Sequence, residues 1–99
     1  MGKNKISRFA ENLTFEHVVQ PTFTQLVKEG LPQRGRWNEL LFERQAPLIL
    51  ELGCGGGEYT VGLARLNPDR NYLGVDIKGA RLWRGARTAK EEGLNNVGF

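Results

Sequence analysis

The chain has little cysteine, little histidine and no long apolar run. Its 99 residues include one cysteine and one histidine. One cysteine forms no internal disulfide, which fits a reducing compartment, and no group of cysteine and histidine has the spacing of a metal site. No stretch approaches the roughly 20 apolar residues that span a bilayer. The N-terminal sequence MGKNKISRFAEN also lacks the apolar run of a signal peptide. We therefore expect a cytoplasmic protein with no metal site and no membrane partner.

Strong charge of either sign is also missing. The net charge is +3 and the pI is about 9.4, which permits a nucleic-acid partner without requiring one. A hydrophobic content of 39% and a charged content of 25% argue against a disordered chain. The length allows one small domain.

The first half of the chain has a mixed pattern, and we assign residues 1–46 to a basic arm followed by helical and loop segments. Residues 1–12 are expected to form a mobile arm or a frayed first helix. Pro21 interrupts any continuous helix in the segment that follows. Residues 28–36 are typical of a loop, and residues 37–42 have the pattern of a short helix.

Residues 47–99 alternate between short apolar runs and amphipathic segments. The predicted strands are 48–52, 71–77 and 97–99, and the predicted helices are 58–66, with Tyr59, Leu63 and Leu66 at helical spacing, and 79–92, with Leu82, Ala86 and Ala89 on one face. This order predicts an α/β fold that forms the first half of a Rossmann-like doubly wound parallel sheet. Right-handed crossovers place the strands in the order 3-2-1.

In a complete fold of this type, further strands would cover the free side of strand 48–52. Without them, its apolar residues form an exposed sheet edge, which promotes self-association. We therefore expect the 99 residues to be the N-terminal fragment of a longer protein, with the half-domain 47–99 truncated.

A glycine-rich turn joins the first of these strands to its helix. Glu51, Gly53, Gly55 and Gly57 form the pattern E-x-G-x-G-x-G. Glycine allows positive φ and a close approach of the backbone to a ligand. The dinucleotide fingerprint G-x-G-x-x-G requires glycine where this chain has Glu58, and the P-loop sequence is absent. Both phosphate-binding interpretations are therefore disfavoured.

The acidic residues near the turn favour S-adenosylmethionine as the ligand. This cofactor carries an amino-acid group, a sulfonium and a ribose, but no phosphate. Glu51 can accept from its ammonium group, and Asp76, at the end of the second strand, can accept from both ribose hydroxyls. The alternative is that the two carboxyl groups only cap helices.

Other reactive or charged residues give weaker signals. Cys54 lies in the turn without a histidine partner, and a packing or surface role is expected for His17. Cations at Lys78, Arg81, Arg84, Arg87 and Lys90 form a broad basic face on the second helix. This face is either simply solvated or able to contact RNA phosphates. Lys3, Lys5, Arg81 and Arg84 are the RNA-binding candidates.

The sequences LILELGCGGGEYTVGLA at 48–64 and NYLGVDIKGARLWRGA at 71–86, with the N-terminal arm, resemble the bacterial tRNA (guanine-N7-)-methyltransferases. The resemblance implies a class I methyltransferase fold and methyl transfer from S-adenosylmethionine to N7 of guanine 46 in the tRNA variable loop. It implies cofactor contacts by Glu51 and by Asp76, where many relatives have glutamate. It also places the catalytic and guanine-binding residues beyond Phe99, so that this chain alone is expected to be inactive.

Two other hypotheses stay open at this point. A methyltransferase with the same cofactor but another substrate would not need its basic residues for substrate binding. A non-catalytic module would bind cofactor or RNA without turnover. A nicotinamide-dependent dehydrogenase is opposed by Glu58.

Overall fold

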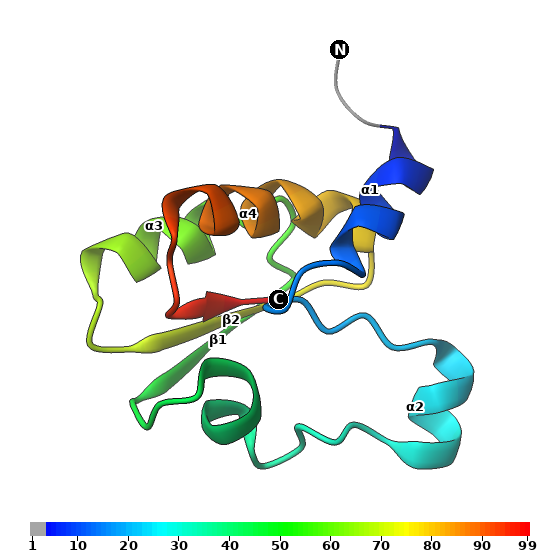
Figure 1. Ribbon diagram of the computed structural model, residues 1–99, viewed down its shortest axis with the longest axis horizontal. Helices are drawn as coiled ribbons and strands as arrows, with labels where there is room; N and C mark the ends of the chain where they lie inside the picture. Colours follow the sequence, from blue (N-terminus) through cyan, green and yellow to red (C-terminus); the bar gives the residue numbers. More distant parts are fainter. Residues whose placement is uncertain (1–3) are drawn as a thin grey trace.

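The computed structural model describes residues 4–99, in which helices alternate with three strands (Figure 1). The helices are α1 (Lys5–Asn12), α2 (Phe23–Glu29), the π-helix η1 (Asn38–Phe42), α3 (Glu58–Leu66) and α4 (Gly79–Glu92). The strands are β1 (Leu48–Leu52), β2 (Asn71–Val75) and β3 (Val97–Gly98). The predicted bounds of α3 and α4 are confirmed, and Gly93 ends α4 in the left-handed conformation expected of a C-cap.

The three strands form one parallel sheet in the order β1-β2-β3. Pairing between β1 and β2 runs from Leu48 opposite Asn71 to Leu52 opposite Val75. Parallel neighbours require a crossover connection, and α3 and α4 supply the two crossovers. The predicted α/β class and strand order are therefore confirmed.

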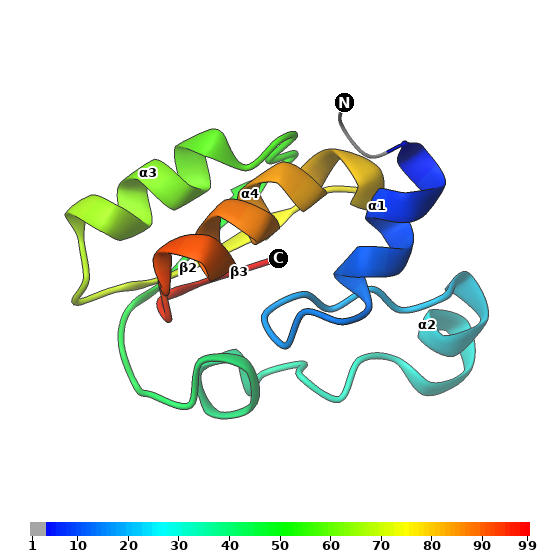
Figure 2. The ribbon, with the colours of Figure 1, turned by 45° about the horizontal axis from the view of Figure 1, so that its top comes forward.

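The helices lie on both faces of this sheet (Figures 1 and 2). Helices α3 and α4 cover one face, with α1 beside α4, whereas η1 and α2 lie toward the opposite face. The indole of Trp83 in α4 donates a 2.6 Å hydrogen bond to Glu11 of α1, and the Arg8 guanidinium lies 4.6 Å from the Trp83 ring centroid. These contacts attach α1 to α4. The division of the chain into 1–46 and 47–99 stays a prediction.

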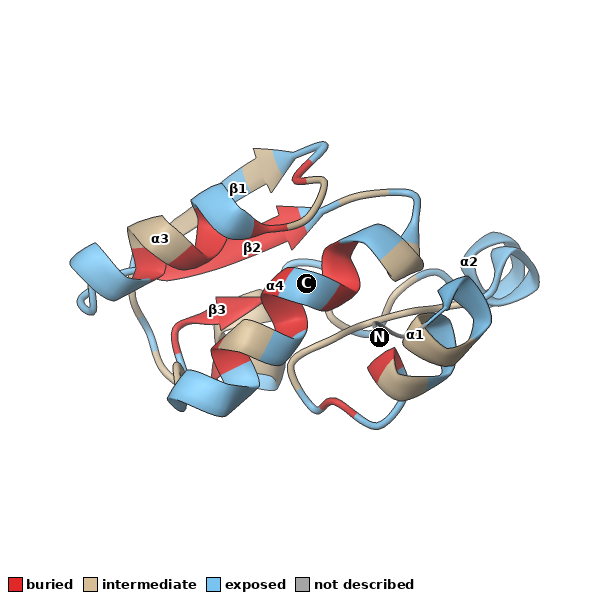
Figure 3. Cartoon of the chain, turned by 90° about the horizontal axis from the view of Figure 1, so that it is seen from above, coloured by how far each residue is buried: buried red, intermediate tan, exposed pale blue. Residues whose placement is uncertain are grey.

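The core lies between the sheet and the helices α3 and α4 (Figure 3). Leu82, Ala86 and Ala89 of α4 are buried, as their spacing predicts. In α3, the predicted helical spacing is confirmed, but only Leu63 of its three apolar residues packs against the core, whereas Tyr59 and Leu66 are exposed. The buried residues of α3 are Thr60, Val61 and Ala64.

The two edges of the sheet are covered differently. At the β1 edge, Leu50 and Leu52 are 54% and 77% exposed, as expected of an uncovered apolar strand. Beyond β3, the Phe99 amide donates to the carbonyl of His17 at 2.9 Å, and the Val19 amide donates to the carbonyl of Phe99 at 2.7 Å. The segment around residues 17–19 therefore follows the chain from β3 into Phe99 as a neighbouring strand would.

Several predicted elements need correction. The second strand ends at Val75 rather than at residue 77, and the third ends at Gly98. Residues 5–12 form helix α1, capped by Asn4. Helix α2 is not among the predicted elements. At its start, the Thr22 side chain accepts from the Gln25 amide, and the Gln25 side chain accepts from the Thr22 amide. This capping box starts a helix directly after Pro21. The helix runs to Glu29, so its last two residues lie within the predicted loop 28–36.

Within residues 4–99, no helix has the length and apolar character needed to cross a membrane. Over the same range, no group of three or more histidine, cysteine, aspartate or glutamate side chains is arranged to hold a metal ion.

Candidate functional site

The turn after β1 has the backbone conformation that only glycine adopts easily. Gly53, Gly55 and Gly57 have φ values of +68°, +58° and +80°, whereas Gly56 is not in this region. The turn is fixed to β2, because the amides of Gly53 and Cys54 both donate to the Val75 carbonyl, at 2.7 and 3.0 Å. The three glycines of the predicted motif are therefore the ones whose conformation a side chain would strain.

Asp76 connects the end of β2 to this turn. Its Oδ2 accepts from the Gly55 amide at 2.9 Å, and its Oδ1 accepts from the Lys78 amide at 2.9 Å. These bonds, that from Lys78 first, hold the pKa of Asp76 below its ordinary value of 3.8. A carboxylate is thus fixed beside Gly55 at the end of β2.

Glu51 lies on the other side of the turn, in β1. Its Oε1 accepts from the Thr60 hydroxyl at 2.9 Å, and Thr60 is 1% exposed. The N-cap residues of α3 and α4, Gly57 and Lys78, make no capping hydrogen bond with their own side chains. Asp76 accepts from the Lys78 amide at the start of α4, so the alternative capping role applies to Asp76, whereas Glu51 bonds the Thr60 side chain of α3.

Cys54 shows the electrostatic character of the turn. Burial, then the nearby charges of Asp76 and Glu51, raise the pKa of its thiol to about 11. Cys54 is therefore a protonated thiol near neutral pH and a poor nucleophile. The same two carboxyl groups that disfavour a thiolate favour a cationic ligand at this turn.

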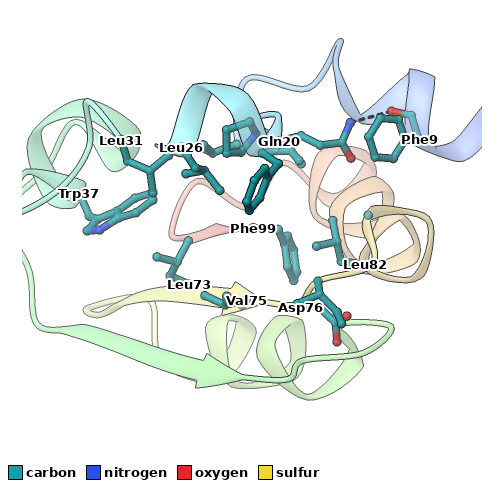
Figure 4. A pocket seen from close by; sticks show the side chains of 17 residues that line it. Phe9, Gln20, Leu26, Leu31, Trp37, Leu73, Val75, Asp76, Leu82 and Phe99 are labelled. Carbon is teal, nitrogen blue, oxygen red and sulfur yellow. Dashed lines mark hydrogen bonds between the residues drawn. The ribbon is translucent and has the colours of Figure 1, made fainter. Parts of the chain in front are cut away.

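A cavity of about 510 Å³ opens next to Asp76 (Figure 4). Its walls come from the end of β2, from Phe99, from α4 and from the N-terminal residues. The labelled lining residues are Phe9, Gln20, Leu26, Leu31, Trp37, Leu73, Val75, Asp76, Leu82 and Phe99. The cavity has the size and the mainly apolar lining of a small-molecule site.

The sequence did not point to the N-terminal wall of this cavity. Gln20 is fixed there, because its Nε2 donates to the Phe9 carbonyl at 2.9 Å and its Oε1 accepts from Asn12 at 3.0 Å. Asn12 also donates to the Gly79 carbonyl at 2.8 Å, at the start of α4. The T-x-x-Q capping box of α2 was a local signal of order in this region, but nothing in the sequence placed the segment beside Asp76.

The structure separates the RNA-binding candidates. Lys5 is exposed at the start of α1 and Arg84 is exposed on α4. Arg81 lies at the glycine turn instead: its Cδ is 3.7 Å from the position of a Cβ on Gly55, and its charge contributes to the lowered pKa of Asp76. Lys3 lies outside the described residues. The predicted RNA-binding set therefore divides into Arg81, which lies at the glycine turn, and the exposed side chains of Lys5 and Arg84.

Other cations of the predicted basic face make contacts within the fold. Arg87 lies 5.4 Å from the Trp83 ring centroid and 3.5 Å from a Glu91 oxygen, and Lys90 lies over Phe15. They are therefore less available to a phosphate backbone.

His17 has the packing role expected from the sequence. Its Nε2 donates to the Ala86 carbonyl at 2.7 Å, and its ring stacks on Phe15 at 5.4 Å. Burial, more than any other cause, lowers the pKa of His17 from 6.5.

Comparisons with known proteins identify the family of the chain. Residues 45–99 match a family described as "Putative methyltransferase". The chain is 58% identical over 98 residues to a protein of Christiangramia forsetii, an alignment that covers 99% of this chain and 44% of that protein. It is 44% identical over 99 residues to a protein of Bacteroides fragilis, covering all of this chain and 39% of the relative. Both relatives bear the name tRNA (guanine-N(7)-)-methyltransferase.

The resemblance seen in the two sequence motifs is thus confirmed. The chain spans less than half the length of these two relatives.

Proposed function

Because this chain belongs to the methyltransferase family that matches residues 45–99, we propose that its glycine turn binds S-adenosylmethionine for methylation of guanine N7 in tRNA. The observation that carries the proposal is the turn itself. Three left-handed glycines lie between the carboxyl groups of Glu51 and Asp76. The substrate part of the proposal is supported by the names of the relatives.

The residues of the turn suit the parts of this cofactor. Asp76 accepts from the amides of Gly55 and Lys78 and has further acceptor capacity on its two oxygens, which we propose the ribose hydroxyls use. Glu51 uses one oxygen for Thr60 and has a second for an ammonium group. The apolar cavity next to Asp76 has room for the flat base of a nucleoside.

The chemistry asks the protein mainly for alignment. When bound, S-adenosylmethionine supplies a methyl group activated by its sulfonium. Guanine N7 has an in-plane lone pair and no proton, so its attack on that methyl needs no general base. Glu51, Gly53, Gly55, Gly57 and Asp76 are proposed to fix the donor, and proximity and orientation supply the acceleration. We assign no guanine-placing group to this chain, which spans less than half of its relatives.

The basic surface is the proposed contact for tRNA. Arg84 and Lys5 are exposed and provide positive charge for backbone phosphates. A cytoplasmic location is part of the same proposal, since tRNA is the substrate in the names of the relatives.

Isothermal titration of S-adenosylmethionine into the chain tests the proposal. We expect saturable binding that Glu51→Ala and Asp76→Ala each weaken about tenfold or more, because each removes hydrogen bonds to a charged group. Asp69→Ala is the matched control, since Asp69 is an exposed carboxylate away from the turn.

Unchanged binding in both site variants would refute the placement of the cofactor. Binding of NAD but not of S-adenosylmethionine would refute its identity and favour a dehydrogenase.

A further inference from the structure

We propose that Phe99 is a positioning residue for the donor-binding turn, an inference that rests on the proposed function. Phe99 is 4% exposed, and its ring lies in a socket made by three glycines of different elements. A Cβ on Gly57 of the turn would lie 2.8 Å from Cε1 of the ring. A Cβ on Gly74 of β2 would lie 2.7 Å from the same atom, and one on Gly85 of α4 would lie 2.9 Å from Cζ. Real Cβ atoms do not approach so closely, so the ring fits only because all three residues are glycine.

The socket joins the parts of the chain that carry the candidate site. Gly57 ends the glycine motif, and Gly74 precedes Asp76 by two residues. A Cβ on Gly85 would also lie 2.9 Å from the Gly56 carbonyl oxygen, so α4 touches the turn directly. The ring of Phe99 therefore fixes the separation of the turn, β2 and α4 from one another.

Backbone conformation does not explain all three glycines. Gly57 has a φ of +80°, where glycine is required for that reason alone. Gly74 and Gly85 have no positive φ. At these two positions the missing side chain is explained by the close approach of the Phe99 ring and, for Gly85, of the turn backbone.

Phe99 is itself held in place from the N-terminal side. Its amide and carbonyl are both hydrogen-bonded to the segment 17–19, at His17 and Val19. Phe99 also lines the cavity next to Asp76 (Figure 4). The ring thus lies between the turn and that cavity, which explains how a residue outside the motif can set cofactor affinity.

A suppressor experiment separates this role from general packing. Gly74→Ala is expected to weaken S-adenosylmethionine binding, because the new methyl group collides with the ring. Adding Phe99→Ala removes that collision. We expect the double variant to bind about fivefold or more tighter than additive losses would give, as coupled neighbouring residues do. Phe42→Ala is the control, since Phe42 is a buried phenylalanine outside the core cluster of Phe99.

A second measurement reads the turn without the cofactor. Cys54 is the only cysteine of the chain, and its Cβ would lie 3.1 Å from a Cβ on Gly74. We expect Phe99→Ala to accelerate labelling of Cys54 by a thiol reagent under native conditions, and Phe42→Ala to leave the rate near that of the wild type. Repeating the labelling at several low denaturant concentrations separates local opening of the turn from labelling through global unfolding, which rises with denaturant.

Each outcome decides one claim. Additive effects of Gly74→Ala and Phe99→Ala, or equal effects of Phe99→Ala and Phe42→Ala on binding and labelling, would overturn the positioning role while leaving the proposed function intact. Failure of the wild-type chain to bind S-adenosylmethionine would overturn the proposed function. Faster Cys54 labelling in Phe99→Ala alone would then still support control of the turn by Phe99.

Discussion

The carboxylate of Asp76 accepts a hydrogen bond from the Gly55 amide at 2.9 Å, across 21 positions of sequence. This bond joins the end of β2 to the turn that follows β1. The bond requires that the Gly55 amide point toward β2, and the left-handed conformation of Gly55 contributes to that orientation. The acid and the glycines are therefore parts of one structure, although they come from separate sequence motifs.

Two glycines with open surroundings separate backbone strain from steric collision. A Cβ on Gly53 or on Gly62 would meet nothing within 4 Å, but only Gly53 has a positive φ, of +68°. We expect Gly53→Ala to lower the free energy of unfolding by about 1–2 kcal/mol, the cost of a left-handed residue with a side chain. Gly62→Ala, within α3, is expected to raise it by about 0.5–1 kcal/mol. Urea denaturation measures both, and equal effects would contradict the conformation of the turn.

His17 should make stability depend on pH. Its pKa in the folded chain lies below the unfolded value of 6.5, so the unfolded chain binds the proton more readily. The contribution of His17 is fully present above pH 6.5 and is lost as the pH falls from there through the folded pKa. His17→Gln should weaken the decline of the unfolding free energy over that range. An unchanged pH profile, measured by urea denaturation at a series of pH values, would show that His17 is not responsible.

Charge reversal at two arginines tests the proposed RNA surface. Arg84→Glu should weaken tRNA binding and reduce the slope of log affinity against log salt concentration by about 1 per lost phosphate contact. The affinity of the Arg84→Glu variant for S-adenosylmethionine should stay the same. Arg81→Glu should change both affinities, because Arg81 lies beside Gly55 and Asp76.

Arg34→Glu is the control for these two variants, since it changes the net charge equally at another exposed site. Fluorescence anisotropy with labelled tRNA measures the binding. If all three variants weakened tRNA binding equally, the effect would come from net charge and not from the α4 surface.

The β1 edge should make the chain self-associate. Leu52 is 77% exposed on a strand that pairs only with β2 among the described residues. Leu52→Lys should reduce concentration-dependent association, because a lysine on an edge strand disfavours pairing with another chain. Leu66→Lys on α3 is matched in exposure, at 79%, and should have little effect. Sedimentation velocity distinguishes the two, and equal behaviour would exclude the β1 edge as the contact.

The sequence was most informative where local signals and tertiary structure agree. The bounds of α3 and α4 followed from glycine, proline and the apolar pattern on either side. The buried face of α3 did not, because Thr60 counts as polar in any such pattern. Its hydroxyl is satisfied by Glu51 of a neighbouring element, which lets a polar residue be buried. Tyr59 and Leu66 are hydrophobic residues, yet both are exposed in the structure.

Long-range contacts explain the remaining differences between the predicted and the observed elements. Strand β2 ends at Val75 because its partner β1 ends opposite it, at Leu52, which a single segment cannot reveal. The sequence pattern does not predict helix α2, because Pro21 indicates a break in any continuous helix, whereas Pro21 in fact directly precedes the N-cap Thr22. The placement of Phe99 among three glycines depends on elements far apart in sequence.

The most direct test of the cofactor site is the response of individual glycine amides to the ligand. The ¹⁵N-labelled chain would be titrated with S-adenosylhomocysteine, which lacks the transferable methyl group, and followed by amide correlation spectra. We predict shifts concentrated at Gly53, Gly55, Gly57 and Asp76, with Gly93 unaffected as a left-handed glycine outside both the turn and the cavity. An unchanged spectrum at the turn, or shifts confined to other regions of the chain, would contradict the assignment of this turn as the donor-binding site.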